Sequence, residues 1–212
     1  MIIVHIWYPQ NTPLEAPIGS LVGGTVYPGW IVPDPEGEVM RWGHAGIEFV
    51  SVVSESGTTY ANGYRAFWPG AGADWQYAAA GRVITDLAFD VHEEGSEPSR
   101  SIRLATGLNE ELIYRYWTSL HAHPLDYTNT GFNCCGAVAV SVRDGFPAGL
   151  SDAPGYPPIT FAGGWLPTGY SNPYALEEWI EDINQCLGHL RHPAPSTATV
   201  PPVVAHGHQD RS

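Results

Sequence analysis

The sequence predicts an α+β domain in which an antiparallel sheet packs against a buried helix. Strand-like runs of β-branched and aromatic residues dominate the first part of the chain, and patterns typical of helices follow in the second half. A length of 212 residues with 43% hydrophobic residues is enough for one domain with its own core. We expect this domain to span residues 1–191. Residues 192–212, which are Pro, Ala, Thr and His with few core-forming residues, are predicted to form a disordered tail.

The predicted strands alternate with turn signals. Four segments have strand character: Ile2–Tyr8, Trp42–Val53, Thr58–Trp68 and Arg82–Phe89. The second and third are separated by a Ser- and Gly-containing turn, so we expect them to form an antiparallel hairpin. The acidic stretch Asp90–Pro98 is predicted to be a loop.

Three helices are predicted, and two begin at an asparagine. Asn109 is a good N-cap for a helix whose apolar residues recur at helical spacing up to Leu120. Asn133 is a second N-cap, and the helix that follows it is small and apolar all round until Gly145, which is typical of a buried helix. A third helix is predicted over Tyr174–Leu187.

Composition excludes several classes of protein. A formal net charge of -13 with only nine Lys and Arg argues against a nucleic-acid binder, because such affinity depends on neutralising phosphates. The three Cys match neither a disulfide framework nor a zinc pair, and we assign no metal or cofactor site. The N-terminus lacks a secretory pattern, and no apolar run approaches the roughly 20 residues that cross a bilayer. We therefore expect synthesis in the cytoplasm without a standard signal peptide, with delivery by a specialised secretion system still open.

The strongest chemical signal is Cys134 at the start of the buried helix. A thiol acts as a nucleophile only as thiolate, and a helix N-terminus and a neighbouring imidazolium both lower its pKa. Cys134 directly follows the cap Asn133, so its own N–H group is also placed to hold an oxyanion. Cys135 is rotated about 100° around the helix. We therefore expect Cys134, rather than Cys135, to be the nucleophile.

His44 is the predicted base among nine histidines, because Gly43, Ala45 and Gly46 leave the surface beside it bare. A His on a strand facing a Cys on a buried helix is the papain arrangement. A third residue should orient the imidazole. Glu48 shares a strand face with His44 and is ranked first, with Asn62 and Tyr60 as alternatives.

Three strings of residues resemble a circularly permuted papain-like group related to NlpC/P60 hydrolases. They are Gly43-His44-Ala45-Gly46-Ile47-Glu48, Tyr64-Arg65-Ala66-Phe67-Trp68-Pro69, and Tyr127 to Asn133-Cys134-Cys135-Gly136-Ala137-Val138-Ala139. In this group the His precedes the Cys along the chain, as it does here. The resemblance covers Ile2 to Gly145. Two positions depart from the pattern: Cys135 replaces a small hydroxyl residue, and Ala66 stands where a polar residue is usual.

The resemblance implies a cysteine hydrolase, a peptidase or amidase, acting by acyl transfer through a Cys134–His44 dyad. It also implies a bacterial effector or toxin whose substrate is a peptide, peptidoglycan or another acyl compound. A cognate immunity protein or a secretion apparatus would then be the expected partner. Two alternatives remain at this point: a lipid or ester acyl hydrolase of the same fold, and a catalytically inert papain-like binding module.

Overall fold

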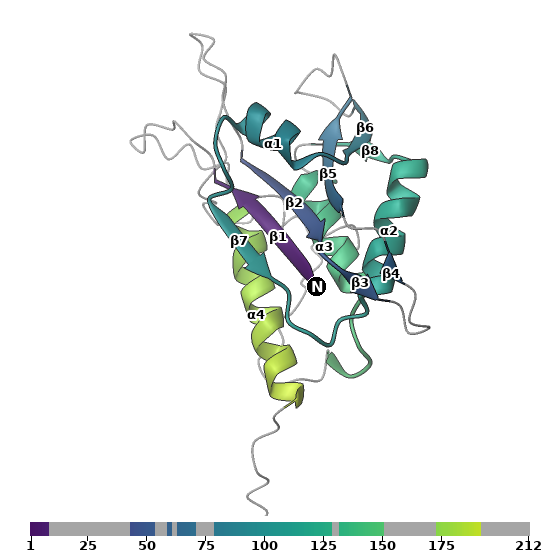
Figure 1. Cartoon of the computed structure of the whole chain (residues 1–212), viewed down its shortest axis with the longest axis vertical. Helices are drawn as coiled ribbons and strands as arrows, with labels where there is room; N and C mark the ends of the chain where they lie inside the picture. Colours follow the sequence, from purple (N-terminus) through teal and green to yellow (C-terminus); the bar gives the residue numbers. More distant parts are fainter. Residues whose placement is uncertain are drawn as a thin grey trace, which may run out of the picture.

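The structure is a computed structural model of the chain, and it describes residues 1–8, 43–53, 59–60, 63–70, 79–128, 132–150 and 173–191. Within these residues the fold is α+β, with an antiparallel sheet and four helices (Figure 1), as the sequence predicts. The predicted tail, residues 192–212, lies outside the described residues. No described helix is long and apolar enough to cross a membrane.

A six-stranded sheet forms the centre of the described structure. The strands are β1 (Ile2–Trp7), β2 (His44–Phe49), β3 (Val52–Val53), β4 (Thr59–Tyr60), β5 (Gly63–Pro69), β6 (Ala79–Ile84), β7 (Arg100–Arg103) and β8 (Asp126–Tyr127). The order in the main sheet is β7-β1-β2-β5-β6-β8, and every neighbouring pair is antiparallel. Strands β3 and β4 form a separate pair. The predicted hairpin is confirmed by the pairing of β2 with β5.

The helices cover the sheet unequally. They are α1 (Leu87–Glu94), α2 (Glu110–Ala122), α3 (Cys134–Asp144) and α4 (Pro173–Arg191). Helix α3 packs against β2 and β5, while α2 and α4 pack against α3. Helix α1 lies over the opposite face of β5, where Leu87 and Val91 contact a small apolar cluster of Trp7, Tyr64 and Ala66. The sheet therefore separates a large core from a smaller layer beneath α1.

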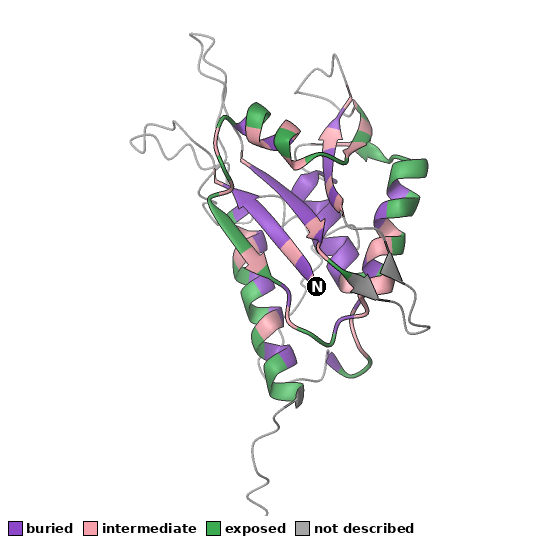
Figure 2. Cartoon of the chain, viewed as in Figure 1, coloured by how far each residue is buried: buried purple, intermediate pink, exposed green. Residues whose placement is uncertain are grey.

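Strand β2 connects these two layers. Its residues Ala45, Ile47 and Phe49 belong to the main core, and each is fully buried. Because side chains alternate along a strand, His44, Gly46 and Glu48 project to the other face. Burial is greatest on β1, β2 and α3, whereas α2 and α4 expose their outer sides (Figure 2). The first residue of β2, His44, is thus fixed between well-packed neighbours.

Both predicted asparagine caps are confirmed. The Asn109 side chain accepts from the Leu112 N–H at 3.1 Å, and the Asn133 side chain accepts from the Gly136 N–H at 3.0 Å. The third predicted helix is present and extends beyond both predicted ends, as Pro173–Arg191.

The prediction for residues 82–98 is wrong in part. Strand β6 ends at Ile84, and the acidic stretch predicted as a loop begins within helix α1. The Asp86 side chain caps this helix by accepting from the Ala88 N–H, and Gly95 closes it with a φ of 67°. The loop was predicted because acidic residues are usually solvated. Asp90 and Glu94 are instead buried, with exposed fractions of 0% and 6%. This correction brings Asp90 into the functional site.

Candidate active site

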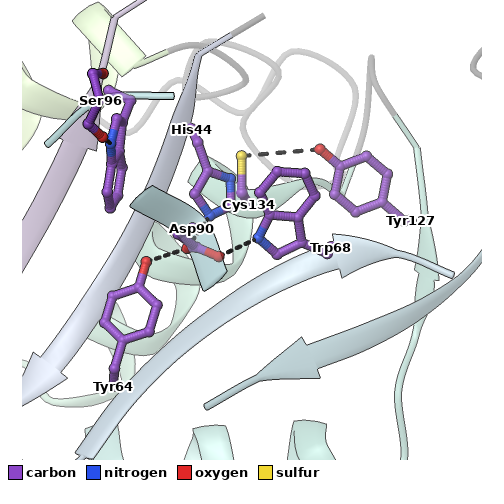
Figure 3. Close-up of polar contacts among 8 residues, drawn as sticks. His44, Tyr64, Trp68, Asp90, Ser96, Tyr127 and Cys134 are labelled. Carbon is purple, nitrogen blue, oxygen red and sulfur yellow. Dashed lines mark hydrogen bonds and ion pairs between the residues drawn. The ribbon is translucent and has the colours of Figure 1, made fainter. Parts of the chain in front are cut away.

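His44 and Cys134 meet where the start of β2 lies against the N-terminus of α3. Both side chains are buried, with exposed fractions of 2% for His44 and 4% for Cys134. Each acts on the pKa of the other, through its charge and through a side-chain interaction. The structure therefore brings together the two residues that the sequence selected independently (Figure 3).

The orienting carboxylate comes from α1. The His44 Nε2 lies 2.8 Å from the Asp90 Oδ2, and Asp90 is fully buried. Since Nε2 is engaged by Asp90, Nδ1 is the ring nitrogen left for the Cys134 sulfur. The order Asp90, His44, Cys134 is visible in Figure 3 and is that of a carboxylate–imidazole–thiol triad.

Glu48 does not occupy the predicted position. Its Oε2 lies 3.1 Å from the Nε2 of His5, on β1, and its side chain is 35% exposed. Glu48 does lie on the same face of β2 as His44. It is four residues further along the strand, however, and its side chain reaches His5 on the neighbouring strand β1 instead. Of the alternatives, Asn62 lies outside the described residues, and only the backbone of Tyr60 is described.

Two further groups approach Asp90. The Trp68 indole N–H donates to the Asp90 Oδ1 at 2.8 Å, and the Tyr64 hydroxyl donates to the Asp90 Oδ2. Trp68 also lies against the His44 ring, with 4.5 Å between the ring centroids. Burial and the neighbouring Asp90 charge raise the pKa of Tyr64 well above its ordinary value, so this hydroxyl remains a donor.

The surroundings of the dyad favour a charged pair. Burial alone would lower the pKa of His44, but the Cys134 thiolate and the Asp90 carboxylate outweigh it and raise that pKa to about 10. A hydrogen bond from the Cys135 thiol lowers the pKa of Cys134, burial opposes it, and the His44 charge and the Ala45 N–H lower it further. The net result is a pKa well below that of an ordinary thiol. Both shifts favour an imidazolium–thiolate pair over a neutral one.

Cys135 differs from Cys134 although the two are neighbours. The hydrogen bond to Cys134, burial and the adjacent thiolate charge raise the pKa of Cys135 well above its ordinary value. It stays a thiol and donates to Cys134. Cys186 lies apart from this pair, in α4, and none of the three cysteines forms a disulfide.

Tyr127 approaches the sulfur from β8. Its hydroxyl lies 3.9 Å from the Cys134 Sγ, on the side away from His44 (Figure 3). Burial and the charges of Cys134 and Cys135 raise the pKa of Tyr127 well above its usual value, so its O–H is retained. With the Cys134 N–H, it offers a second donor near the position where an oxyanion would form.

Asp90 and Tyr127 were missed as site residues for different reasons. Asp90 carried a local signal: Asp86, Leu87, Val91 and Gly95 have the spacing of a short capped helix. Tyr127 lies only seven residues before Cys134, at the start of one of the strings that resemble the family, but its approach to the sulfur depends on the pairing of β8 with β6.

The described residues contain no group of three or more His, Cys, Asp and Glu side chains that could hold a metal ion. The site itself offers a thiol, an imidazole, a buried carboxylate and neutral donors. Comparison of the chain with protein-family models, curated proteins and solved structures found no match.

Proposed function

We propose that this chain is a cysteine hydrolase of the permuted papain-like, NlpC/P60-related kind, cleaving an amide bond by acyl transfer. One observation carries the proposal: the His44 ring lies between the buried carboxylate of Asp90, at 2.8 Å, and Cys134 at the capped start of α3. The chain order, with His44 on a strand ahead of Cys134 on a helix, agrees with the permuted pattern.

The site supports a two-step mechanism. The Cys134 thiolate attacks the substrate carbonyl carbon, and the resulting oxyanion accepts from the Cys134 N–H and the Tyr127 hydroxyl. The His44 imidazolium then gives its proton to the leaving nitrogen, which departs as an amine and leaves a thioester on Cys134. In the second step His44, now neutral, takes a proton from water. The hydroxide attacks the thioester, the acid is released, and the thiolate and imidazolium are restored.

Asp90 acts through His44 in both steps. Its negative charge stabilises the imidazolium, and the Nε2–Oδ2 bond fixes the ring so that Nδ1 faces the sulfur. We place the substrate among peptide or peptidoglycan amides and the protein among bacterial effectors or toxins, on the resemblance of the motifs around His44 and Cys134.

The test is digestion of purified peptidoglycan sacculi and of a mixed peptide library, with products identified by mass spectrometry. Wild-type protein should generate new amine termini, and Cys134→Ala should generate none. A parallel assay with phospholipid vesicles and short-chain thioesters separates the acyl-ester alternative, which would give free fatty acid and no new amines. If the wild-type protein cleaves none of these substrates and its Cys134 alkylates no faster than an ordinary thiol, the proposal of a hydrolase is overturned in favour of an inert binding module.

A further inference from the structure

We infer that Tyr64 and Trp68 are positioning residues that hold the Asp90 carboxylate against His44 as a clamp. We infer further that position 46 is a glycine because a side chain there would block the Tyr64 hydroxyl from reaching Asp90. This inference rests on the proposed function and deepens it. It concerns how the acid of the triad is held, given that Asp90 comes from a separate helix on the far face of the sheet.

The first observation is that both carboxylate oxygens are engaged. Oδ2 meets the His44 Nε2 at 2.8 Å and accepts from the Tyr64 hydroxyl, while Oδ1 accepts from the Trp68 indole N–H at 2.8 Å. A buried carboxylate is costly unless such donors replace water, and Asp90 has no exposed surface. Any rotation of the carboxylate breaks at least one of these bonds, so the three donors fix its orientation.

The second observation is the close approach of Tyr64 to Gly46. Strand register places Gly46 opposite Ala66 and Glu48 opposite Tyr64, so the Tyr64 ring leans diagonally across β2. A Cβ atom at Gly46 would overlap the Tyr64 hydroxyl and would lie only 2.7 Å from its Cε2. The space that a side chain would fill at position 46 is therefore occupied by the hydroxyl that binds Asp90.

The third observation is that Trp68 contacts two members of the triad. Its indole N–H binds Asp90, and its ring lies 4.5 Å from the His44 ring at an interplanar angle of 35°. An aromatic face beside a cationic ring stabilises the charged form. Trp68 thus supports the imidazolium directly and its counter-charge through a hydrogen bond.

These contacts matter because the charges of His44 and Cys134 depend on the groups around them. The ionisable groups that interact with His44, with the two neighbouring cysteines or with one another around them come from α1, α3, β5 and β8: Asp90, Glu94, Cys135, Tyr64 and Tyr127. Among them, Tyr64 is a donor to the Asp90 oxygen that binds His44. Loss of its hydroxyl should loosen Asp90, lower the pKa of His44 and, through the weaker positive charge, raise the pKa of Cys134.

The experiment measures the rate of Cys134 alkylation by iodoacetamide against pH, which requires no substrate. Tyr64→Phe and Trp68→Phe are compared with Tyr174→Phe, whose ring stacks on Tyr8 on a different part of the molecule. In the acidic range, at pH below the pKa of Cys134, each clamp variant should alkylate roughly 3- to 10-fold more slowly than wild type at the same pH, since one pKa unit there changes the thiolate fraction about tenfold. Tyr174→Phe should match wild type.

Gly46→Ala provides an independent arm. It should reproduce the slower alkylation of Tyr64→Phe by displacing the hydroxyl, whereas Gly188→Ala, where a Cβ meets nothing within 4 Å, should not. Thermal melting of each variant reports folding, and Tyr64→Phe, which keeps the ring, decides the question if Gly46→Ala or Trp68→Phe fails to fold.

The outcomes separate the two proposals. An unchanged pH profile in folded Tyr64→Phe, with fast alkylation in wild type, overturns the clamp and leaves the proposed function standing. A wild-type Cys134 that reacts like an ordinary thiol overturns the proposed function itself. Where a substrate is in hand, the alkaline limb of kcat/KM should move to lower pH in the clamp variants, which a merely structural role would not produce.

Discussion

Two histidines on the same face of the sheet have similar partners and different surroundings. His44, on β2, bridges the Asp90 carboxylate and Cys134. His5, on β1, bridges the Glu48 carboxylate at 3.1 Å and the Ser101 hydroxyl at 2.9 Å. Each ring therefore lies between an acid and a potential nucleophile, which is the outline of a catalytic triad.

The difference lies in what surrounds each set. Asp90 is fully buried and held by three donors, whereas the Glu48 side chain is 35% exposed. Cys134 stands at the capped N-terminus of a helix, while Ser101 lies within the exposed strand β7. Antiparallel pairing readily sets an imidazole between an acid and a hydroxyl. A helix N-terminus, a buried carboxylate and fixed donors all favour an activated nucleophile, and of these two sets only that of His44 combines them.

The largest expected effect tests directly whether the His44 set, and not the His5 set, takes part in the reaction. Cys134→Ala and His44→Ala should each lower hydrolysis at least about 1,000-fold, because the covalent pathway is lost, while the fold is retained. Ser101→Ala should change the rate by less than about twofold, as expected for an exposed residue away from the chemistry. Activity on the amide substrate found by sacculus or peptide digestion measures both. Equal losses in the two sets would make the His5 cluster part of the reaction.

The next effect distinguishes the two carboxylates. Asp90→Asn should reduce kcat/KM by about 10²- to 10⁴-fold, because the amide neither stabilises the imidazolium nor fixes the same ring orientation. Glu48→Gln should alter it less than about threefold. Glu48→Gln serves as the matched control, since both changes remove one carboxylate next to a histidine. A larger loss for Glu48→Gln than for Asp90→Asn would restore the assignment made from the sequence.

These two carboxylates show how far the sequence predicted the site. Cys134 and His44 were predicted because each has a local signature: an asparagine cap with a small-residue helix for one, and flanking Gly and Ala for the other. The partner of His44 is 46 positions away on a helix across the sheet, and strand alternation favoured the nearer Glu48. Local patterns predicted the fold class, two caps and the strands β1, β2 and β5, but not β7, β8 or helix α1. Which acid reaches a given imidazole depends on tertiary packing.

A smaller effect concerns pH. Cys134 alkylation should stay fast at about pH 6, where an ordinary thiol with a pKa of about 8.5 is almost wholly protonated. Its rate should fall only as pH drops through the lowered pKa of Cys134. On the alkaline side, kcat/KM should decline as pH rises towards about 10, because His44 then loses the proton it gives to the leaving group. Stopped-flow or quenched alkylation across pH 4–11 checks the prediction, and a rate that falls tenfold per unit below about pH 8 contradicts it.

The smallest effect tests whether the N-terminus of α3 contributes to the activation of Cys134, which has no counterpart at Ser101. Asn133→Ala and Asn109→Ala each remove one side-chain cap, and each should cost about 1 kcal/mol of unfolding free energy in denaturant titrations. Only Asn133→Ala should also slow Cys134 alkylation, by about two- to fivefold, because it loosens the first turn of α3, where Cys134 lies at the positive end of the helix dipole. Asn109 caps α2 and controls for the loss of stability. Equal alkylation rates in the two variants would assign the activation of Cys134 to His44, Cys135 and the Ala45 N–H, without a contribution from the start of α3.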